Sequence, residues 1–155
     1  MICGKFVNSF FDIGLSAAAG TVELFNNGIK IDKSRDYSVL GTDFNFIYKN
    51  IDLRLEYIQQ AISSSKNNLI ANSAQWKAWY SQAAYRFKPS PWEAIIRVGS
   101  FLSADAEGTQ HQIAIGIDYW FTTTTVFKFA YAVNNGQTSS SANNNQILAQ
   151  MVFKF

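Results

Sequence analysis

Hydrophobic and polar residues alternate with a period of two through most of the chain. In one stretch, Phe127, Phe129 and Tyr131 alternate with Lys128 and Ala130. Such alternation is typical of a β-strand that has one apolar face and one more polar face. The pattern predicts about eight strands, and their expected ranges are 10–24, 37–49, 51–63, 74–88, 92–104, 109–121, 126–135 and 145–155.

The connections between these strands alternate in length. Tight turns are expected at 50–51, 88–91 and 122–125, whereas the polar and mostly longer loops are 25–36, 64–73, 105–108 and 136–144. Short turns at one end and long loops at the other are typical of outer-membrane barrels. A tilted strand needs about 9–11 residues to cross the hydrocarbon layer, and the expected strands are long enough. The sequence therefore predicts an all-β fold, an antiparallel transmembrane β-barrel.

Composition agrees with interleaved apolar and polar positions. Of the 155 residues, 48% are hydrophobic and 15% are charged, yet the mean hydropathy is −0.05. No run approaches the ~18 apolar residues of a transmembrane helix. Residues 1–9 show neither a clear strand pattern nor the features of a signal peptide. We expect a single barrel segment over 1–155, with 1–9 as a poorly defined N-terminal stretch.

The alternation places most charged residues on the polar face. Such a face would be a costly protein core, because buried ions need partners, but it suits the wall of a water-filled channel. The predicted pore-lining residues are Lys49, Arg54, Arg86, Arg97, Lys128, Lys154, Asp52, Glu56, Glu93 and Asp118, and Asp12 and Asp43 share their face. Most of the basic residues lie near the tight turns, where they would form a partial basic belt at the periplasmic mouth, and they are Lys49, Arg54, Arg86, Lys128 and Lys154. Ordinary ion pairing of these residues with Asp52, Glu93 and Asp118 is an equal alternative to that belt. The near balance of charge gives no support for strong anion selection.

Aromatic residues gather beside the tight turns and at the chain end. Trp and Tyr favour membrane interfaces, since each has an apolar ring and a polar edge. The predicted membrane girdle comprises Tyr48, Phe87, Trp92, Phe121, Phe127 and Phe155. A second girdle on the loop side is expected to begin with Tyr37, Trp76 and Trp79. The alternative for all of these rings is a plain hydrophobic core.

No catalytic constellation stands out. His111 is the single histidine and Cys3 the single cysteine, so neither a zinc site nor a disulfide is expected. The sequence contains no nucleotide-binding fingerprint, and the net charge of +2 does not favour nucleic acid. We expect no enzyme, cofactor or metal. The rival functions are a complete eight-stranded outer-membrane barrel acting as an anchor or binding module, and a soluble lipocalin-like barrel with its apolar face around a ligand.

Five short segments in the second half of the chain form a recognisable set, and they are Ala83–Phe87, Trp92–Arg97, Ile115–Phe121, Phe127–Tyr131 and Gln150–Phe155. They resemble the C-terminal part of the phosphate-selective porin O and P family. The likeness covers about half of the chain well. Asp118 stands where the family more often has Asn, and Leu55 replaces a Gly in the upstream Leu53–Tyr57 strand.

The resemblance implies a barrel of about sixteen strands, usually trimeric, in the bacterial outer membrane. Such barrels pass small anions or other small hydrophilic solutes, and lipid surrounds them. This chain would then supply the C-terminal half. The resemblance also implies that Phe155 is the signal by which the barrel-assembly machinery recognises the protein. No constriction loop maps onto this segment. The near balance of charge does not favour phosphate selectivity itself.

Overall fold

The computed structural model describes residues 2–8, 10–23, 25–26, 29–30, 35–64, 73–104, 108–136 and 145–153. Nine strands form one antiparallel sheet in the order β1-β2-β5-β6-β7-β8-β9-β10-β11. Their bounds are β1 Ile2–Val7, β2 Phe11–Val22, β5 Arg35–Tyr48, β6 Ile51–Ile62, β7 Ala74–Arg86, β8 Trp92–Leu102, β9 Thr109–Trp120, β10 Thr125–Gly136 and β11 Gln146–Phe153. A separate hairpin joins β3 (Phe25–Asn26) to β4 (Ile29–Lys30). Within the described ranges, no helix is long and apolar enough to cross a membrane.

All eight strands expected from the alternation are present, and β1 is an additional ninth strand. The sequence pattern left residues 1–9 undefined, but Ile2–Val7 pairs with β2 over its full length. Gly4 interrupts the apolar positions of this short segment, which hides its period. The β3–β4 hairpin lies within 25–36, where the sequence predicted a loop.

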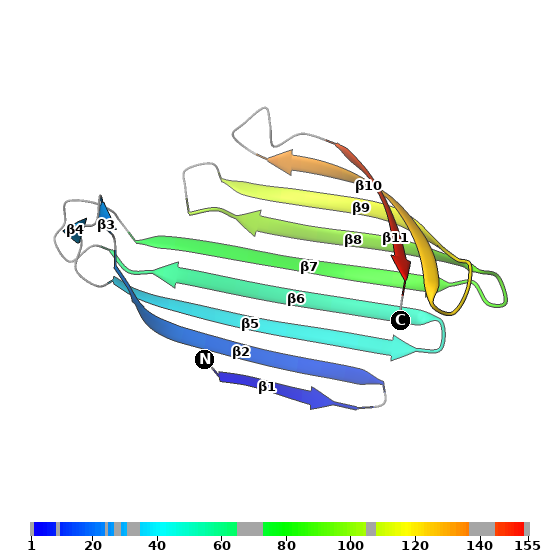
Figure 1. Ribbon diagram of the computed structural model, residues 1–155, viewed down its shortest axis with the longest axis horizontal. Coiled ribbons are helices and arrows are strands. Elements are labelled where there is room, and N and C mark those ends of the chain that lie inside the picture. The colour runs from blue at the N-terminus through cyan, green and yellow to red at the C-terminus, as the bar shows by residue number, and fades with distance from the viewer. Residues whose placement is uncertain are drawn as a thin grey trace.

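The connections fall into two groups at opposite ends of the sheet (Figure 1). At the turn end, strands are joined by residues 8–10, 49–50, 87–91 and 121–124. At the loop end, they are joined by 23–34, 63–73, 103–108 and 137–145. This separation confirms the alternation of short and long connections. Each strand of the sheet therefore runs between a turn end and a loop end.

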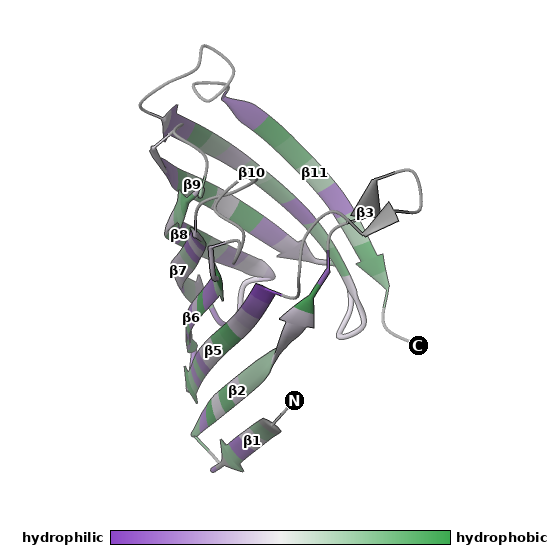
Figure 2. Cartoon of the chain, turned by 90° about the vertical axis from the view of Figure 1, so that its left-hand side faces the viewer, coloured by the Kyte–Doolittle hydropathy of each residue, from purple (hydrophilic) through white to green (hydrophobic). Residues whose placement is uncertain are grey.

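The sheet curves, with β1 and β11 at its two margins, and hydrophobic and hydrophilic positions alternate along its strands (Figure 2). Residues that are paired in the register share one face of the sheet. The fully buried described residues all lie on the same face, and they are Gly14, Gly41, Ala84, Asp118, Val126 and Ala132. We call this the concave face, because side chains converge and shield one another on the inside of a curve. The opposite face is the convex face.

Small residues make the concave face possible. A Cβ atom at Gly14 would collide with the carboxylate of Asp43 on the neighbouring strand. A Cβ atom at Gly41 would lie 2.7 Å from the hydroxyl oxygen of Ser16. Glycine therefore leaves room for polar side chains to lie flat against the inner wall, and it is required here for close approach.

Candidate functional site

The concave face gathers charged side chains in the half of the sheet nearer the turn end. We call these residues the charged belt, and they are Lys5, Asp12, Asp43, Asp52, Arg54, Glu56, Arg86, Glu93, Arg97, Asp118 and Lys128. Eight of the ten predicted pore-lining residues are therefore on one face. Lys49 instead occupies the β5–β6 turn, and Lys154 lies outside the described residues. On the convex face, the described sheet carries two charged residues, Asp36 and Lys77, both toward the loop end.

Asp118 is the centre of one row of the charged belt. The register aligns Lys128, Asp118, Glu93 and Arg86 on four neighbouring strands. The Lys128 ammonium lies 2.8 Å from a carboxylate oxygen of Asp118, whose side chain is only 2% exposed. The Arg86 guanidinium lies 4.5 Å from the centre of the Trp120 ring. The row thus holds a buried ion pair and a cation that rests on an aromatic face.

The two arginines in the next part of the belt have different partners. Arg54 donates two hydrogen bonds to the carboxylate of Asp52, at 3.1 and 2.8 Å. Arg97 donates two hydrogen bonds to the amide oxygen of Gln82, at 2.9 and 2.6 Å, and lies 4.9 Å from the centre of the Tyr80 ring. Among the described residues, Arg97 has no carboxylate within ion-pairing distance. The alternative of ion pairing is therefore correct for Arg54 and Lys128. Arg86, for which it was also expected, instead lies against the Trp120 ring.

A hollow of about 310 Å³ lies on the concave face between these groups. Its polar lining comprises Arg54, Gln82, Arg97, Gln112, Asp118, Lys128 and Gln150. Cations, a carboxylate and neutral amides all face this space. Such a wall can hydrogen-bond water and small polar solutes of either charge.

Sequence reasoning missed several members of this wall. Lys5 pairs with Asp12 at 3.4 Å, and it was missed because β1 was not recognised. Gln82 and Tyr80, which position Arg97, carry no signal of their own in the sequence. Their role depends on the register between β7 and β8, which the alternation cannot supply.

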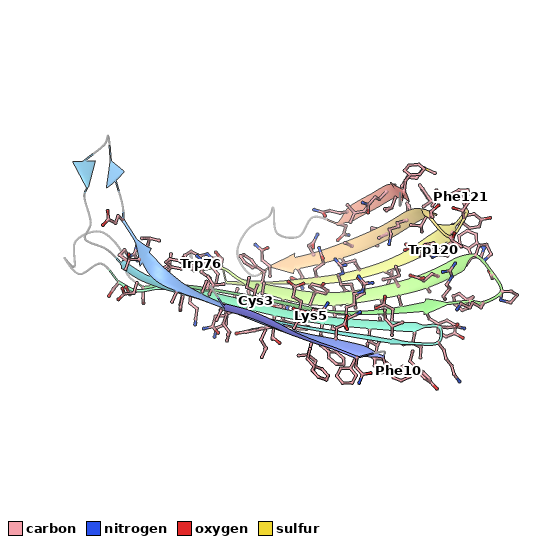
Figure 3. All side chains as sticks on the ribbon, turned by 60° about the horizontal axis from the view of Figure 1, so that its bottom comes forward. Cys3, Lys5, Phe10, Trp76, Trp120 and Phe121 are labelled. Atoms are coloured by element: carbon pink, nitrogen blue, oxygen red, sulfur yellow. The ribbon has the colours of Figure 1, made fainter. Side chains whose placement is uncertain are left out.

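Aromatic rings line the turn end of the convex face. Of the predicted girdle, Tyr48, Trp92 and Phe127 lie on the convex face, and Phe87 and Phe121 follow their strands directly at that end. Phe155 lies outside the described residues. Figure 3 shows Phe121 and Phe10 near this end, and Trp76 toward the opposite end.

These rings contact one another and extend the girdle beyond its predicted members. The ring of Tyr119 lies 4.6 Å from that of Trp92 and 4.8 Å from that of Phe121, centre to centre. Tyr85 and Phe87 are 5.0 Å apart. Further rings in contact at this end are Phe6, Phe10, Phe11, Phe44 and Phe46. We call the whole set the aromatic belt.

The second girdle expected on the loop side is only partly correct. Trp79 lies on the convex face, where its register partner is Tyr57. Trp76 and Tyr37 lie on the concave face, because each falls one residue out of phase with the convex positions of its strand. The prediction considered how close each ring lies to the loop end of its strand, but not which face of the strand it occupies.

The aromatic belt crosses the strands obliquely. A register row is the line of paired residues that runs across the strands. The row that contains Phe6 on β1 reaches β10 at Val133, and Phe127 lies six residues nearer the turn end of β10 than Val133 does. That offset is about 20 Å along the strands over about 34 Å across them, which is an angle of roughly 30°. Strands in β-barrels tilt by about 35–45° from the barrel axis.

The polar limit at the loop end has the same slant. Asn135 on β10 shares a register row with Thr42 on β5. On β5, the first charged convex residue, Asp36, comes six residues nearer the loop end than Thr42. Between the two limits, β10 offers nine residues, from Phe127 to Asn135. The convex face is therefore an apolar band bounded by two slanted and roughly parallel lines.

The remaining candidate, His111, gives no sign of catalysis. It lies on the convex face between Ser100 and Asn135 in the register. In the described part of the chain, no three His, Cys, Asp or Glu side chains are close enough to hold a metal ion.

A known protein family matches nearly the whole length of this chain. The family description "phosphate-selective porin O and P" matches residues 11–155. The chain belongs to this porin family. No curated protein and no solved structure matches the chain significantly. The family is one of outer-membrane channels and not of enzymes, and it implies a bacterial outer-membrane location. The open nine-stranded antiparallel sheet is consistent with part of a porin barrel.

Proposed function

We propose that the concave face of this porin chain is the wall of a water-filled channel for the passive diffusion of small hydrophilic solutes or anions. One observation carries this proposal: the charged belt and its amides occupy the concave face, whereas large apolar side chains are exposed on the convex face. Ile115 and Ile147, for example, are 58% and 70% exposed there. In a soluble protein, exposing so large an apolar surface would be unfavourable.

The convex band is the surface that we assign to outer-membrane lipid. Its height of nine residues on β10 falls within the ~9–11 residues that a tilted strand needs to cross the hydrocarbon layer. Its aromatic belt matches the girdle at a membrane interface. In this arrangement, the turn end faces the periplasm and the loop end faces outward. Assembly as a homotrimer, and recognition of Phe155 by the barrel-assembly machinery, are further parts of the proposal that rest on the family.

The charges of the wall favour a weakly selective channel. Three of its basic residues, Lys5, Arg54 and Lys128, lie in ion pairs. Paired charges present little net field to a passing ion, so general diffusion of hydrophilic solutes is favoured over strict anion selection. Arg86 and Arg97 have no carboxylate partner among the described residues. Of these two, Arg97 lines the hollow on the concave face, so it is the cation that we expect to influence permeating ions most.

The rival functions fit the structure less well. A lipocalin-like barrel needs an apolar interior, but the concave face here holds the charges. A complete eight-stranded anchor needs a closed sheet of eight strands, but nine strands are present and the described sheet is open.

The test is single-channel conductance in planar bilayers, measured for the refolded chain and for the full-length gene product. We expect conducting channels from the full-length form. Arg97→Glu should then shift the reversal potential in a salt gradient toward cation preference, since it changes the wall by two charges. Lys77→Glu makes the same change on the convex face and should shift it less. Insertion without conductance by the full-length product would contradict the channel.

A further inference from the structure

Part of the concave wall is apolar and aromatic instead of charged. On the loop-end side of the charged belt, the described strands β5 to β8 carry two register rows without a charged residue. One row contains Ile58, Ala78 and Phe101, and the next contains Gln60 and Trp76. Ile58 is 45% exposed and Phe101 is 41% exposed. A channel wall that only contacts water does not require exposed aromatic rings at these positions.

The two rings line neighbouring hollows. A hollow of about 390 Å³ is bounded by Ile58, Gln60, Trp76, Ala78 and Phe101, together with the strand at Lys77. A second hollow of about 260 Å³ also contacts Phe101 and continues to Gln110 and Arg97. Sites for small molecules have volumes of roughly 300–1,000 Å³. The rings therefore border a space of suitable size for a small ligand.

Each ring has a glutamine directly opposite it on the neighbouring strand. Gln60 is the register partner of Trp76, and Gln110 is the register partner of Phe101. We call these four residues the aromatic platform. Neither glutamine amide, nor the indole N–H of Trp76, has a hydrogen-bond partner within the described part of the chain. The platform thus combines apolar ring faces with unused donors and acceptors.

We propose that the aromatic platform is a binding site for the ring of a neutral carbohydrate on its way through the channel, and this inference rests on the proposed function. A sugar ring has a face of C–H groups and a rim of hydroxyls. The electron-rich face of Trp76 or Phe101 attracts the C–H face, and the amides of Gln60 and Gln110 can donate to and accept from the hydroxyls.

Other ligand classes fit these residues less well. An anion would find no cation in the two uncharged rows, and Arg97, at the far side of the second hollow, already donates two hydrogen bonds to Gln82. A purely apolar ligand would cover the glutamine amides without satisfying them, which is costly. A neutral polyol satisfies both the rings and the amides.

The test measures maltotriose binding to the full-length gene product, refolded in detergent, by isothermal titration calorimetry. We expect wild-type binding, and Phe101→Ala should weaken it by roughly three- to tenfold, the range of one aromatic contact. Phe129→Ala is the matched control, because Phe129 is 42% exposed but lies on the convex face, and it should leave binding unchanged. Gln110→Ala tests the polar half and should also weaken binding. Circular dichroism confirms that each variant has folded.

The outcomes separate the two proposals. Absence of maltotriose binding by the folded wild-type protein, or equal weakening by Phe101→Ala and Phe129→Ala, overturns the carbohydrate site. Salt conductance of the same preparation tests the channel independently. Channels that conduct salt and show no block by maltotriose overturn only the carbohydrate site. Maltotriose binding that needs Phe101, without any conductance, overturns only the channel.

Discussion

Asp118 is a carboxylate that the protein keeps almost entirely from solvent, with Lys128 as its ionic partner. We predict that Asp118→Asn lowers the free energy of unfolding by about 1–3 kcal/mol, because a buried charge-assisted hydrogen bond is lost. Asp52→Asn is the matched control. Asp52 also ion-pairs at 2.8 Å, with Arg54, but its side chain is 27% exposed, so the loss should be at most about 1 kcal/mol. Urea unfolding in lipid vesicles measures both, and equal losses would contradict the role of burial.

Lys49 occupies the tight β5–β6 turn with a φ of 54°. This left-handed conformation costs a side-chain-bearing residue about 1–2 kcal/mol, and glycine avoids that cost. We therefore predict that Lys49→Gly raises the urea midpoint of unfolding. Asn50→Gly changes the other residue of the same turn, which has no such φ, and should not raise it. A lower midpoint for Lys49→Gly than for wild type would refute the argument.

At the scale of single residues, the sequence predicted which face a side chain occupies better than it predicted which residues that side chain contacts. Alternation correctly placed Arg54, Arg97 and Asp118 on one face, since side-chain phase within a strand is a local property. Lys49 was misplaced because the strand ends at Tyr48, and a turn breaks the phase. The partners of Arg97 could not be predicted, because Gln82 reaches it only through the pairing of β7 with β8.

At the scale of strands, the assignment of the two faces can be tested directly. Ile115 and Gln112 lie on β9, on the convex and concave faces respectively. We predict that Ile115→Arg, in the middle of the apolar band, destabilises the folded protein in lipid by about 2–4 kcal/mol and reduces insertion. Gln112→Arg should insert normally. Heat-dependent gel mobility after folding into vesicles distinguishes the two, and normal insertion of Ile115→Arg would contradict the lipid-facing assignment.

The slant of the convex band shows why the sequence of single strands does not predict where the membrane crosses the sheet. Each strand alone reveals an apolar face and an aromatic end. Only the register shows that Phe6 and Phe127 bound the same band although their rows are six residues apart. Register arises from long-range pairing, and a shift by one residue would exchange the two faces. Trp76 and Tyr37 were placed in the second girdle for a different reason, because the prediction did not consider the phase of their strands.

At the scale of the whole sheet, the number of strands limits how a barrel can close. With nine antiparallel strands, β1 and β11 run in the same direction. Joining these two strands directly would create a parallel pair. Joining β11 of one copy to β1 of a second copy with the same orientation would do the same. Outer-membrane barrels of bacteria have an even number of antiparallel strands, so closure around this sheet requires an odd number of further strands.

This parity predicts the behaviour of the isolated chain. The described edges of β1 and β11 present unpaired backbone groups, which lipid does not tolerate and which promote association. We therefore expect residues 1–155, refolded alone in detergent, to form oligomers or aggregates, and the full-length gene product to form a compact heat-modifiable barrel. Light scattering coupled to size-exclusion chromatography measures the difference. A monodisperse, protease-resistant monomer of residues 1–155 would mean that the chain closes by itself. It would close either through a parallel seam between β1 and β11 or, with β1 displaced, through an antiparallel seam between β2 and β11.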